Sequence, residues 1–236
     1  MKKISCIIPA YNEGKRIASV LDIVIGHPLI SEVIVVDDGS SDDTRDVVAR
    51  YSSIKLIALE KNGGKSAAIV EGVRQAENEL ILFLDADLSG LSANALSSLI
   101  EPVQSGKADV SISLRHNSPL QWRLMGLDYI SGERVFSKNF LMPLLPSLLS
   151  INGFGLEVYL NRAIIKQRLR IAVVWWSGVH SAFKYTAAQE WWYFGIKKDY
   201  IRMFFLVMRT ITPFEMARQI IQMLRLRRVY KNGIAK

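Results

Sequence analysis

Two acidic residues next to an apolar segment could bind a metal ion together with a phosphorylated ligand. Asp85 and Asp87 flank Ala86 and follow the segment ILFL directly. At the end of a strand, two carboxylates one residue apart can point at one place, and their hard oxygen atoms suit Mg²⁺ or Mn²⁺. Such an ion usually keeps water ligands and bridges to substrate phosphates. The alternative is a pair of solvated loop acids.

A second acidic cluster, Asp37-Asp38-Gly39-Ser40, ends the apolar segment EVIVV. Carboxylates in this position can accept hydrogen bonds from a base or a ribose, as in other nucleotide-binding α/β folds. The same residue types also suit a turn followed by a helix cap. The two interpretations are compatible with each other.

Two further features have weaker chemical signatures. Asn62-Gly63-Gly64-Lys65 precedes a helical pattern, so its backbone could approach a phosphate that Lys65 would neutralise; a plain turn is the alternative. It is not a P-loop, because GxxxxGK[ST] is absent. His180 lies in SGVHSAFK after an expected strand, and a lone histidine is more often structural than a ligand.

The elements expected to position these residues alternate between strands and helices. Short β-branched segments predict buried strands at 3–8, 32–36, 54–59, 79–84 and 108–113. Amphipathic patterns predict helices at 13–25, 42–51, 65–76 and 92–104, the last with Ser92 as N-cap. This alternation predicts a parallel sheet with helices on both faces. Ligands bind at the carboxyl ends of such strands, where PAYNE, DDGSSDDT and DADLSG all fall.

The pattern changes after residue 115. We expect a helix over 120–142 with a polar SGER insert, a Gly-broken segment at 151–160 leading into a helix, and a short strand at 171–175. The remainder is expected to be helical and basic, with a last helix after Pro213. An apolar stripe on that helix consists of Phe214, Ala217, Ile221 and Leu224, with Arg218 and Arg225 on another face.

Composition fits a folded chain of one domain, or one domain with a small appendage. The net charge of +8 lies wholly in residues 191–236, where ten Lys/Arg face two acids. We therefore expect a neutral catalytic body at 1–185 and a basic, amphipathic extension at 186–236. The only cysteine, Cys6, is expected to be buried. We expect neither a secretory signal nor a membrane-spanning segment, because the apolar segments are short and interrupted by prolines.

Taken in order, IIPAYNE, VVDDGSSDDT, KNGGK and LDADLS resemble family 2 glycosyltransferases of the GT-A fold, a Rossmann-like α/β architecture. The resemblance is strong over residues 4–90 and weaker after about residue 115. GFGLEVYL and GVHSAFK resemble the later motifs of the branch that contains polyprenyl-phosphate glycosyltransferases and glucosyl-3-phosphoglycerate synthases. After DADL, however, this chain has Ser89 where many polyprenyl-phosphate enzymes have Gln. SGERVFSKNF is only loosely similar to their acceptor loops, so the acceptor does not follow from the resemblance.

The resemblance implies roles for individual residues. Pocket residues for the nucleotide sugar would be Pro9, Ala10, Tyr11, Glu13, Asp38, Gly64, Lys65, Asp85 and Ala86. Among these, Asp38 would read the base, Lys65 would approach the donor and Asp85 would contact ribose or bridge toward the metal. Asp87 would bind Mg²⁺ or Mn²⁺ directly, together with Asp85 and His180. Glu157 would hold sugar hydroxyls or act as a base, and Arg115 could add positive charge.

The prediction is a metal-dependent transfer of a hexose from a UDP- or GDP-linked donor to a lipid-linked or phosphate-bearing acceptor. The basic extension, with Trp191–Phe194, Lys197, Lys198 and MFFLVM, predicts peripheral attachment to the cytoplasmic, anionic face of a membrane. The alternatives are that its aromatic residues pack under the sheet while its charges are solvated, or that it is buried in a homodimer. A nucleotidyltransferase is a rival interpretation, but PAYNEGKR is a poor phosphate loop. A non-catalytic nucleotide-sugar or nucleic-acid binding module is another, although no nucleic-acid motif is present.

Overall fold

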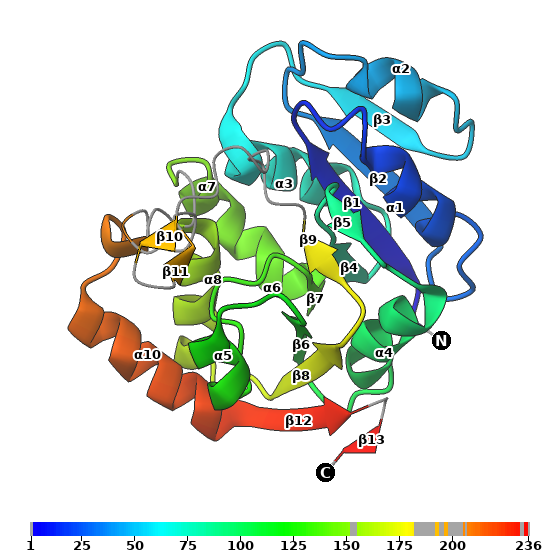
Figure 1. Ribbon diagram of the computed structural model, residues 1–236. Helices are drawn as coiled ribbons and strands as arrows, with labels where there is room; N and C mark the ends of the chain where they lie inside the picture. Colours follow the sequence, from blue (N-terminus) through cyan, green and yellow to red (C-terminus); the bar gives the residue numbers. More distant parts are fainter. Residues whose placement is uncertain are drawn as a thin grey trace.

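The structure is a computed structural model that describes residues 2–151, 155–181, 192–193, 196–197, 205, 207–231 and 234–235. Its centre is a nine-stranded sheet in the order β13-β12-β8-β6-β7-β4-β1-β2-β3 (Figure 1). The strands are β1 (Ile4–Ala10), β2 (Glu32–Asp37), β3 (Lys55–Ala58), β4 (Leu80–Phe83), β6 (Val110–Arg115), β7 (Arg134–Ser137), β8 (Ile171–Trp176), β12 (Arg227–Lys231) and β13 (Ile234–Ala235). Most neighbours are parallel; β7 runs antiparallel to β4 and β6, and β13 antiparallel to β12.

Two short ribbons lie outside this sheet. β5 (Leu88–Ser89) pairs with β9 (His180–Ser181), and β10 (Trp192–Tyr193) pairs with β11 (Ile196–Lys197). The β5/β9 ribbon joins the segment after β4 to the segment after β8, so it connects the two halves of the sheet at its carboxyl edge.

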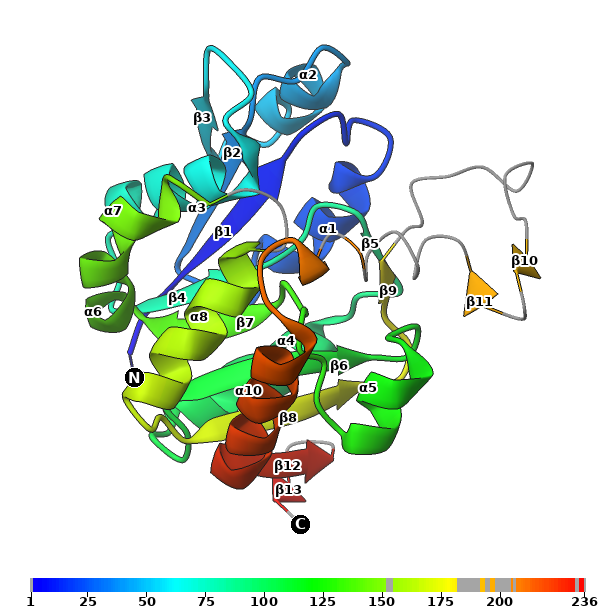
Figure 2. The same cartoon turned by 90° about the vertical axis from the view of Figure 1, so that its left-hand side faces the viewer.

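Helices cover both faces of the sheet (Figures 1 and 2). They are α1 (Ile17–Val24), α2 (Thr44–Ala49), α3 (Gly64–Gln75), α4 (Ala93–Gln104), α5 (Leu120–Met125), α6 (Lys138–Leu141), the 3₁₀ helix η1 (Met142–Leu144), α7 (Leu145–Leu148), α8 (Gly155–Lys166) and α10 (Pro213–Leu226). Side chains of β1 alternate between two cores: Ile7 packs with α3 and α8, while Cys6 and Ile8 pack with α1 and α4. Burial on both faces explains why these strands are almost continuously apolar.

Up to residue 115 the expected strands and helices are confirmed. Each predicted strand and helix is present within a few residues of its expected bounds. Ser92 caps α4, because its side chain accepts a hydrogen bond from the Ala95 amide. Cys6 is fully buried, as expected, and this burial raises the pKa of its thiol. The expected short strand at 171–175 corresponds to β8.

The expected helix over 120–142 is wrong. The helix α5 ends at Met125, where Gly126 adopts a left-handed conformation with φ of 65°. The chain then enters the sheet as β7, between β4 and β6. The SGER insert is fully internal: Ser131 and Glu133 are 0% exposed and Arg134 is 1% exposed. The charged residues of this segment take part in a buried polar network.

The C-terminal segment contains a strand in addition to its helix. β12 pairs in parallel with β8, and Ile220 and Met223 of α10 pack into the core beside α8. The boundary after residue 185 stays a prediction. In the described part of the chain, no helix is both long and apolar enough to cross a bilayer. The side chains of Trp191–Phe194, Lys197 and Lys198, and part of MFFLVM, lie outside the described residues.

Candidate functional site

A pocket of about 370 Å³ opens at the carboxyl ends of β1, β2 and β4. All the residues expected to bind a nucleotide sugar line it, and so do Asp87 and two residues that the resemblance did not assign, Asn62 and Ala68. Asp38 and Asp87, which follow different strands, therefore face one cavity. The topology explains this convergence, because β1 lies between β2 and β4 with all three strands parallel.

The loop after β1 is fastened to the loop after β2. The amide of Asn12 donates to Ser40 Oγ at 2.9 Å, and the amide of Glu13 donates to Thr44 Oγ1 at 2.9 Å. Asn12 has φ of 55°, a left-handed conformation that Asn tolerates better than most residues. The Glu13 carboxylate also accepts a hydrogen bond from Arg16 Nε at 2.6 Å. These contacts fix one wall of the pocket.

Asp38 holds the glycine turn in place. Its two carboxylate oxygens accept hydrogen bonds from the amides of Gly63 and Gly64, each at 2.8 Å. Burial raises the pKa of Asp38 above its usual value, although the two amide bonds oppose this effect. Gly39 has φ of +72°, and a Cβ at this position would lie 2.9 Å from the amide nitrogen of Asn62. The acidic motif and the glycine motif therefore form one preorganised turn.

Lys65 lies between two carboxylates. Its Nζ is 2.7 Å from Asp85 Oδ1 and 3.3 Å from Glu157 Oε1. Burial opposes the charge on Lys65, but Asp85 and Glu157 outweigh it and raise the pKa of the ammonium. Burial would likewise raise the pKa of Asp85, but Lys65 and Arg115 lower it below the ordinary value. Lys65 is therefore paired with the acids of the site, whereas the sequence alone placed it against the donor.

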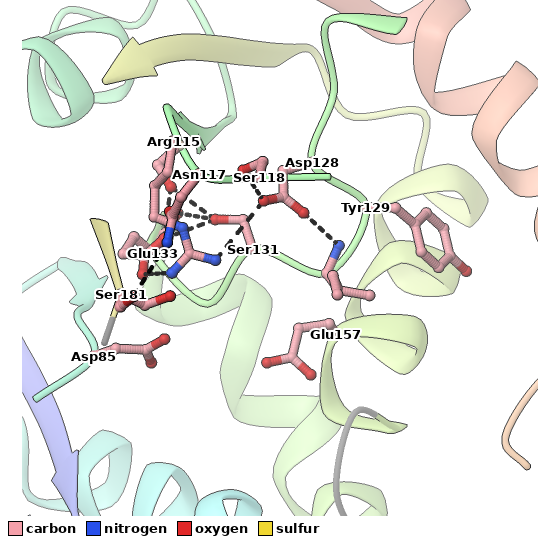
Figure 3. A network of polar contacts seen from close by, with 12 residues as sticks. Asp85, Arg115, Asn117, Ser118, Asp128, Tyr129, Ser131, Glu133, Glu157 and Ser181 are labelled. Atoms are coloured by element: carbon pink, nitrogen blue, oxygen red, sulfur yellow. Dashed lines mark hydrogen bonds and ion pairs between the residues drawn. The ribbon is translucent and has the colours of Figure 1, made fainter. Parts of the chain in front are cut away.

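The buried SGER segment forms the wall behind this pair. A Cβ on Gly132 would lie 2.6 Å from Lys65 Nζ and 2.8 Å from either oxygen of Asp85. Arg115 Nη1 donates to Glu133 Oε1 at 2.9 Å (Figure 3). Burial raises the pKa of Glu133, although Arg115 opposes this shift. Gly132 and Glu133 could not be assigned a role from the sequence, because nothing in this polar segment shows that it is buried.

Glu157 approaches the same region from α8. Its side chain and that of Asp85 enter this region from different elements, as Figure 3 shows. Glu157 is 3% exposed, and its Oε2 atom has no hydrogen-bond partner among the described residues. An unpaired buried carboxylate oxygen is costly unless a ligand or solvent satisfies it. This atom is therefore available to a hydroxyl group of a bound ligand.

His180 lies in the β5/β9 ribbon opposite Ser89 and is not among the residues that line the pocket. Its ring contacts that of His116 edge-on, with 5.5 Å between the ring centroids. His116 was not among the predicted site residues, although its position directly after β6, at the end of a strand, is a signal that could have identified it. No three acidic, histidine or cysteine side chains in the described ranges are grouped closely enough to hold a metal ion. Asp85, Asp87 and His180 thus form no preassembled trio, and metal binding by these residues stays a prediction.

A divalent ion is still compatible with these residues. Mg²⁺ is usually held by one or two carboxylates together with substrate phosphates and water, and not by a complete protein cage. Asp87 lines the pocket, and Asp85 is its neighbour in the same lining. Lys65 pairs with Asp85 and Glu157, and Arg115 also lowers the pKa of Asp85, so a divalent ion would join two cations that already lie near these carboxylates.

A family model and several known proteins match this chain. The model for "Glycosyl transferase family 2" matches residues 5–167. A human dolichyl-phosphate beta-glucosyltransferase is 38% identical over 101 residues, which covers 36% of this chain and 31% of the relative. A 4,4'-diaponeurosporenoate glycosyltransferase of Staphylococcus aureus is 37% identical over 107 residues, covering 44% of this chain and 28% of the relative. The chain thus aligns with less than a third of the length of these relatives.

A crystal structure of glucosyl-3-phosphoglycerate synthase from Mycobacterium tuberculosis superimposes with a TM-score of 0.65 at 22% identity, covering 95% of this chain and 80% of the other. That protein was crystallised with Mn²⁺, uridine diphosphate and glucosyl-3-phosphoglycerate. At this level of identity the likeness concerns the fold. The expected GT-A architecture is confirmed.

Proposed function

The chain belongs to glycosyl transferase family 2, and on this premise we propose that it transfers a hexose from a nucleoside diphosphate sugar to an acceptor oxygen. The observation that carries the proposal is the convergence of Asp38, Lys65, Asp85 and Asp87 on one pocket at the carboxyl edge of the sheet. This edge is where α/β folds bind nucleotides. The two relatives with sugar-transfer names support the same class of reaction.

In this proposal, the nucleotide occupies the pocket between the loop after β1 and the turn that Asp38 holds. Tyr11 is 43% exposed beside the opening, where it can pack against a ring, while Glu13 lies 5% exposed in the lining. Each carboxylate oxygen of Asp38 already accepts one hydrogen bond, from the amide of Gly63 or of Gly64. Each oxygen therefore has one lone pair left to accept a hydrogen bond from the base or the ribose. Asp38 would then bind the nucleotide directly and would also hold in place the Gly63–Gly64 turn that borders it.

The diphosphate would lie toward Asp87. A bound Mg²⁺ or Mn²⁺, held by Asp87 with Asp85 or His180, would supply charge neutralisation for the leaving diphosphate. The Mn²⁺ complexes of the mycobacterial synthase support this choice of metal. Lys65 and Arg115 keep Asp85 ionised by lowering its pKa. Asp85 is thereby maintained as an anion next to the diphosphate site.

Glu157 is placed to receive the acceptor. Its Oε2 atom needs a hydrogen-bond donor, and the hydroxyl of an alcohol acceptor would provide one. If the acceptor is a phosphate, which is already ionised at neutral pH, Glu157 instead binds a hydroxyl of the donor sugar. The names of the relatives give dolichyl phosphate and 4,4'-diaponeurosporenoate as their substrates, and the first of these supports a lipid-linked acceptor for this chain.

An exposed face on α10 and α5 supports attachment to an anionic membrane. Phe214 is 80% exposed and Ile221 52% exposed on α10, whereas Leu224 of the same predicted stripe is partly buried against the core. Arg218 and Arg225 are exposed on the same helix. Leu124 on α5 is 79% exposed. Apolar side chains flanked by arginines are typical of helices that lie in the lipid interface.

The two helices are joined at their ends. Arg227, which follows α10, donates a hydrogen bond from Nη1 to the carbonyl of Gly126 at 2.8 Å, and Gly126 ends α5. Ten Lys/Arg against two acids in residues 191–236 match a negatively charged partner. We therefore assign this face to the anionic cytoplasmic leaflet of a membrane. The alternative is that this face binds a second copy of the chain. In that case a homodimer would form without lipid.

The donor can be identified by thermal unfolding with a panel of UDP- and GDP-linked hexoses in the presence of Mn²⁺. The donor should raise the melting temperature more than the corresponding nucleoside diphosphate with free hexose. If no nucleotide sugar changes the melting temperature with Mn²⁺ or Mg²⁺, the proposed function is wrong.

A further inference from the structure

A buried loop, residues 127–133, lies between the donor pocket and α10. It joins α5 to β7, and all of its residues are buried. On one side, Gly132 meets Lys65 and Asp85, where a Cβ would lie only 2.6 Å from Lys65 Nζ. On the other side, Tyr129 points away from Asp85 (Figure 3) and bonds to α10. One short loop therefore contacts both the donor site and the C-terminal helix.

The contact with α10 is a buried hydrogen bond between two side chains. The Tyr129 hydroxyl donates to Gln219 Oε1 at 2.6 Å, and the two residues are 0% and 4% exposed. Burial raises the pKa of Tyr129 to about 12, so the hydroxyl keeps its proton and remains a donor at neutral pH. Gln219 Nε2 in turn donates to Glu215 Oε1 at 3.1 Å, and the same oxygen accepts a bond from Arg162 of α8. A rotation of α10 about its axis would break these bonds.

Gln219 differs in chemistry from the residues beside it on the buried side of α10. Ile220 and Met223 are apolar and pack in the core next to α8. A buried amide costs free energy unless hydrogen bonds satisfy it, whereas an apolar side chain would pack here without that cost. The net stabilisation by one such bond is small. The Tyr129–Gln219 bond is therefore better explained by the position that it specifies than by the stability that it adds.

Between its two contacts the loop is fastened to itself and to α8. Arg134, the first residue of β7, donates from Nε to the Ser131 carbonyl at 2.7 Å and from Nη2 to the Tyr129 carbonyl at 3.2 Å. Asn161 of α8 donates to the same Tyr129 carbonyl at 2.8 Å. Because the bonds from Arg134 span Gly132, a displacement of Tyr129 also displaces this glycine, which borders the donor site.

We propose that Tyr129 and Gln219 are positioning residues, whose bond fixes the wall behind the donor pocket. Neither residue lines that pocket, so both act through Gly132 on the Lys65–Asp85 pair. The proposal rests on the proposed function, because it takes the pocket to be the nucleotide-sugar site. It also makes α10 a structural part of that site, in addition to the role of this helix at a membrane.

Three variants of the full chain test the proposal: Tyr129→Phe, Gln219→Leu and the two changes together. Each single change leaves one buried polar group without its partner and should lower the free energy of unfolding in urea. The double variant removes both groups and should regain most of that stability. In calorimetric titrations with UDP, and with GDP in parallel, in the presence of Mn²⁺, all three should still bind nucleotide at least about threefold more weakly than the unmodified chain. Gln222→Leu, which changes a half-buried glutamine of α10, is the matched control and should bind normally.

A second measurement reports on the pair itself and needs no nucleotide. ¹⁵N NMR of the lysine ammonium groups should contain a signal that is lost in Lys65→Met. This signal should shift in all three variants but not in Gln222→Leu. If the unmodified chain binds neither nucleotide, the proposed function is wrong, and the Lys65 signal alone decides whether the loop is coupled to α10.

Three results would overturn the proposal. The first is a Lys65 signal that is absent from the unmodified chain or is the same in every variant. The second is a nucleotide affinity that the variants leave unchanged. The third is an affinity that recovers together with stability in the double variant, because this result would make the Tyr129–Gln219 bond a contributor to stability only.

Discussion

Lys65 Nζ lies 2.7 Å from Asp85 Oδ1, so the lysine of the glycine turn is bonded to the first acid of the DAD motif. This pair links two motifs that are 20 residues apart in the chain, and Gly132 leaves room for it. The lysine is therefore paired with an acid of the site before any ligand binds. In the proposed function, a divalent ion that binds with the donor would supply further positive charge for the diphosphate.

Replacement of Lys65 should destabilise the protein and weaken donor binding. Lys65→Met leaves Asp85 and Glu157 near each other without a cation. Removing one partner of a fully buried pair costs about 3–5 kcal/mol; since the Lys65 side chain is 31% exposed, we expect a smaller loss, of about 2 kcal/mol. Urea unfolding measures the loss. The double variant Lys65→Met/Asp85→Asn should recover part of it, and strictly additive losses would show that the two residues do not interact.

The same pair predicts a pH profile. The pKa of Asp85 is lowered in the folded state, so its stabilising contribution is present above the unfolded pKa and is lost as pH falls through the folded value. The pKa of Lys65 is raised, so its contribution is lost as pH rises through its folded value. The stability difference between the unmodified chain and Lys65→Met should be constant from about pH 5 to about pH 9 and decrease below about pH 4. A difference that changes steadily across the neutral range would contradict this assignment.

Gly132→Ala should damage the site more than the fold. Its Cβ would overlap Lys65 Nζ and both Asp85 oxygens, so the pair must separate. We expect nucleotide-sugar affinity to decrease by at least about tenfold, because the Asp85 carboxylate would be displaced. Calorimetric titration of the donor measures this effect. Gly178→Ala is the control, since a Cβ there meets no atom within 4 Å; equal affinities in the two variants would show that Gly132 has no special role.

The exposed face of α10 predicts salt-sensitive lipid binding. Arg218→Gln/Arg225→Gln should lower partition into anionic vesicles by about thirty-fold, because each arginine near such a surface contributes about 1 kcal/mol. Phe214→Ser/Ile221→Ser should weaken binding through lost apolar contact. Co-sedimentation at low and high salt measures both. Met142→Ser, which alters an exposed apolar residue of η1, is the control. Equal partition into neutral and anionic vesicles would argue against an electrostatic attachment.

The first half of the fold and the pocket lining could be predicted from the sequence because local signals agreed with tertiary ones. Apolar strands were followed directly by polar motifs, and parallel topology brings such positions to one edge. Asp38 and Asp87 were placed correctly for this reason. The alternation of Ile7 with Cys6 and Ile8 also reflects burial on both faces, which is why the strands were recognised so clearly.

The second half was less predictable because its determinants are non-local. Nothing near Glu133 in the sequence shows that Arg115 lies opposite it or that the SGER segment is internal. The apolar residues of α10 were assigned to one stripe, but the side that packs on α8 contains Gln219, Ile220 and Met223. The buried side of α10 contains residues whose partners are far away in the chain. For example, the Tyr129 hydroxyl donates a hydrogen bond to Gln219 Oε1.

The central claim is that Asp87 binds a divalent ion together with the donor diphosphate. Calorimetric titration of UDP, and of GDP in parallel, with and without Mn²⁺ tests it in the unmodified chain, in Asp87→Asn, and in Asp46→Asn as an exposed acid of α2. We predict that Mn²⁺ strengthens nucleotide binding in the unmodified chain and in Asp46→Asn, but has little effect in Asp87→Asn. The same Mn²⁺ dependence in all three proteins would contradict the role assigned to Asp87.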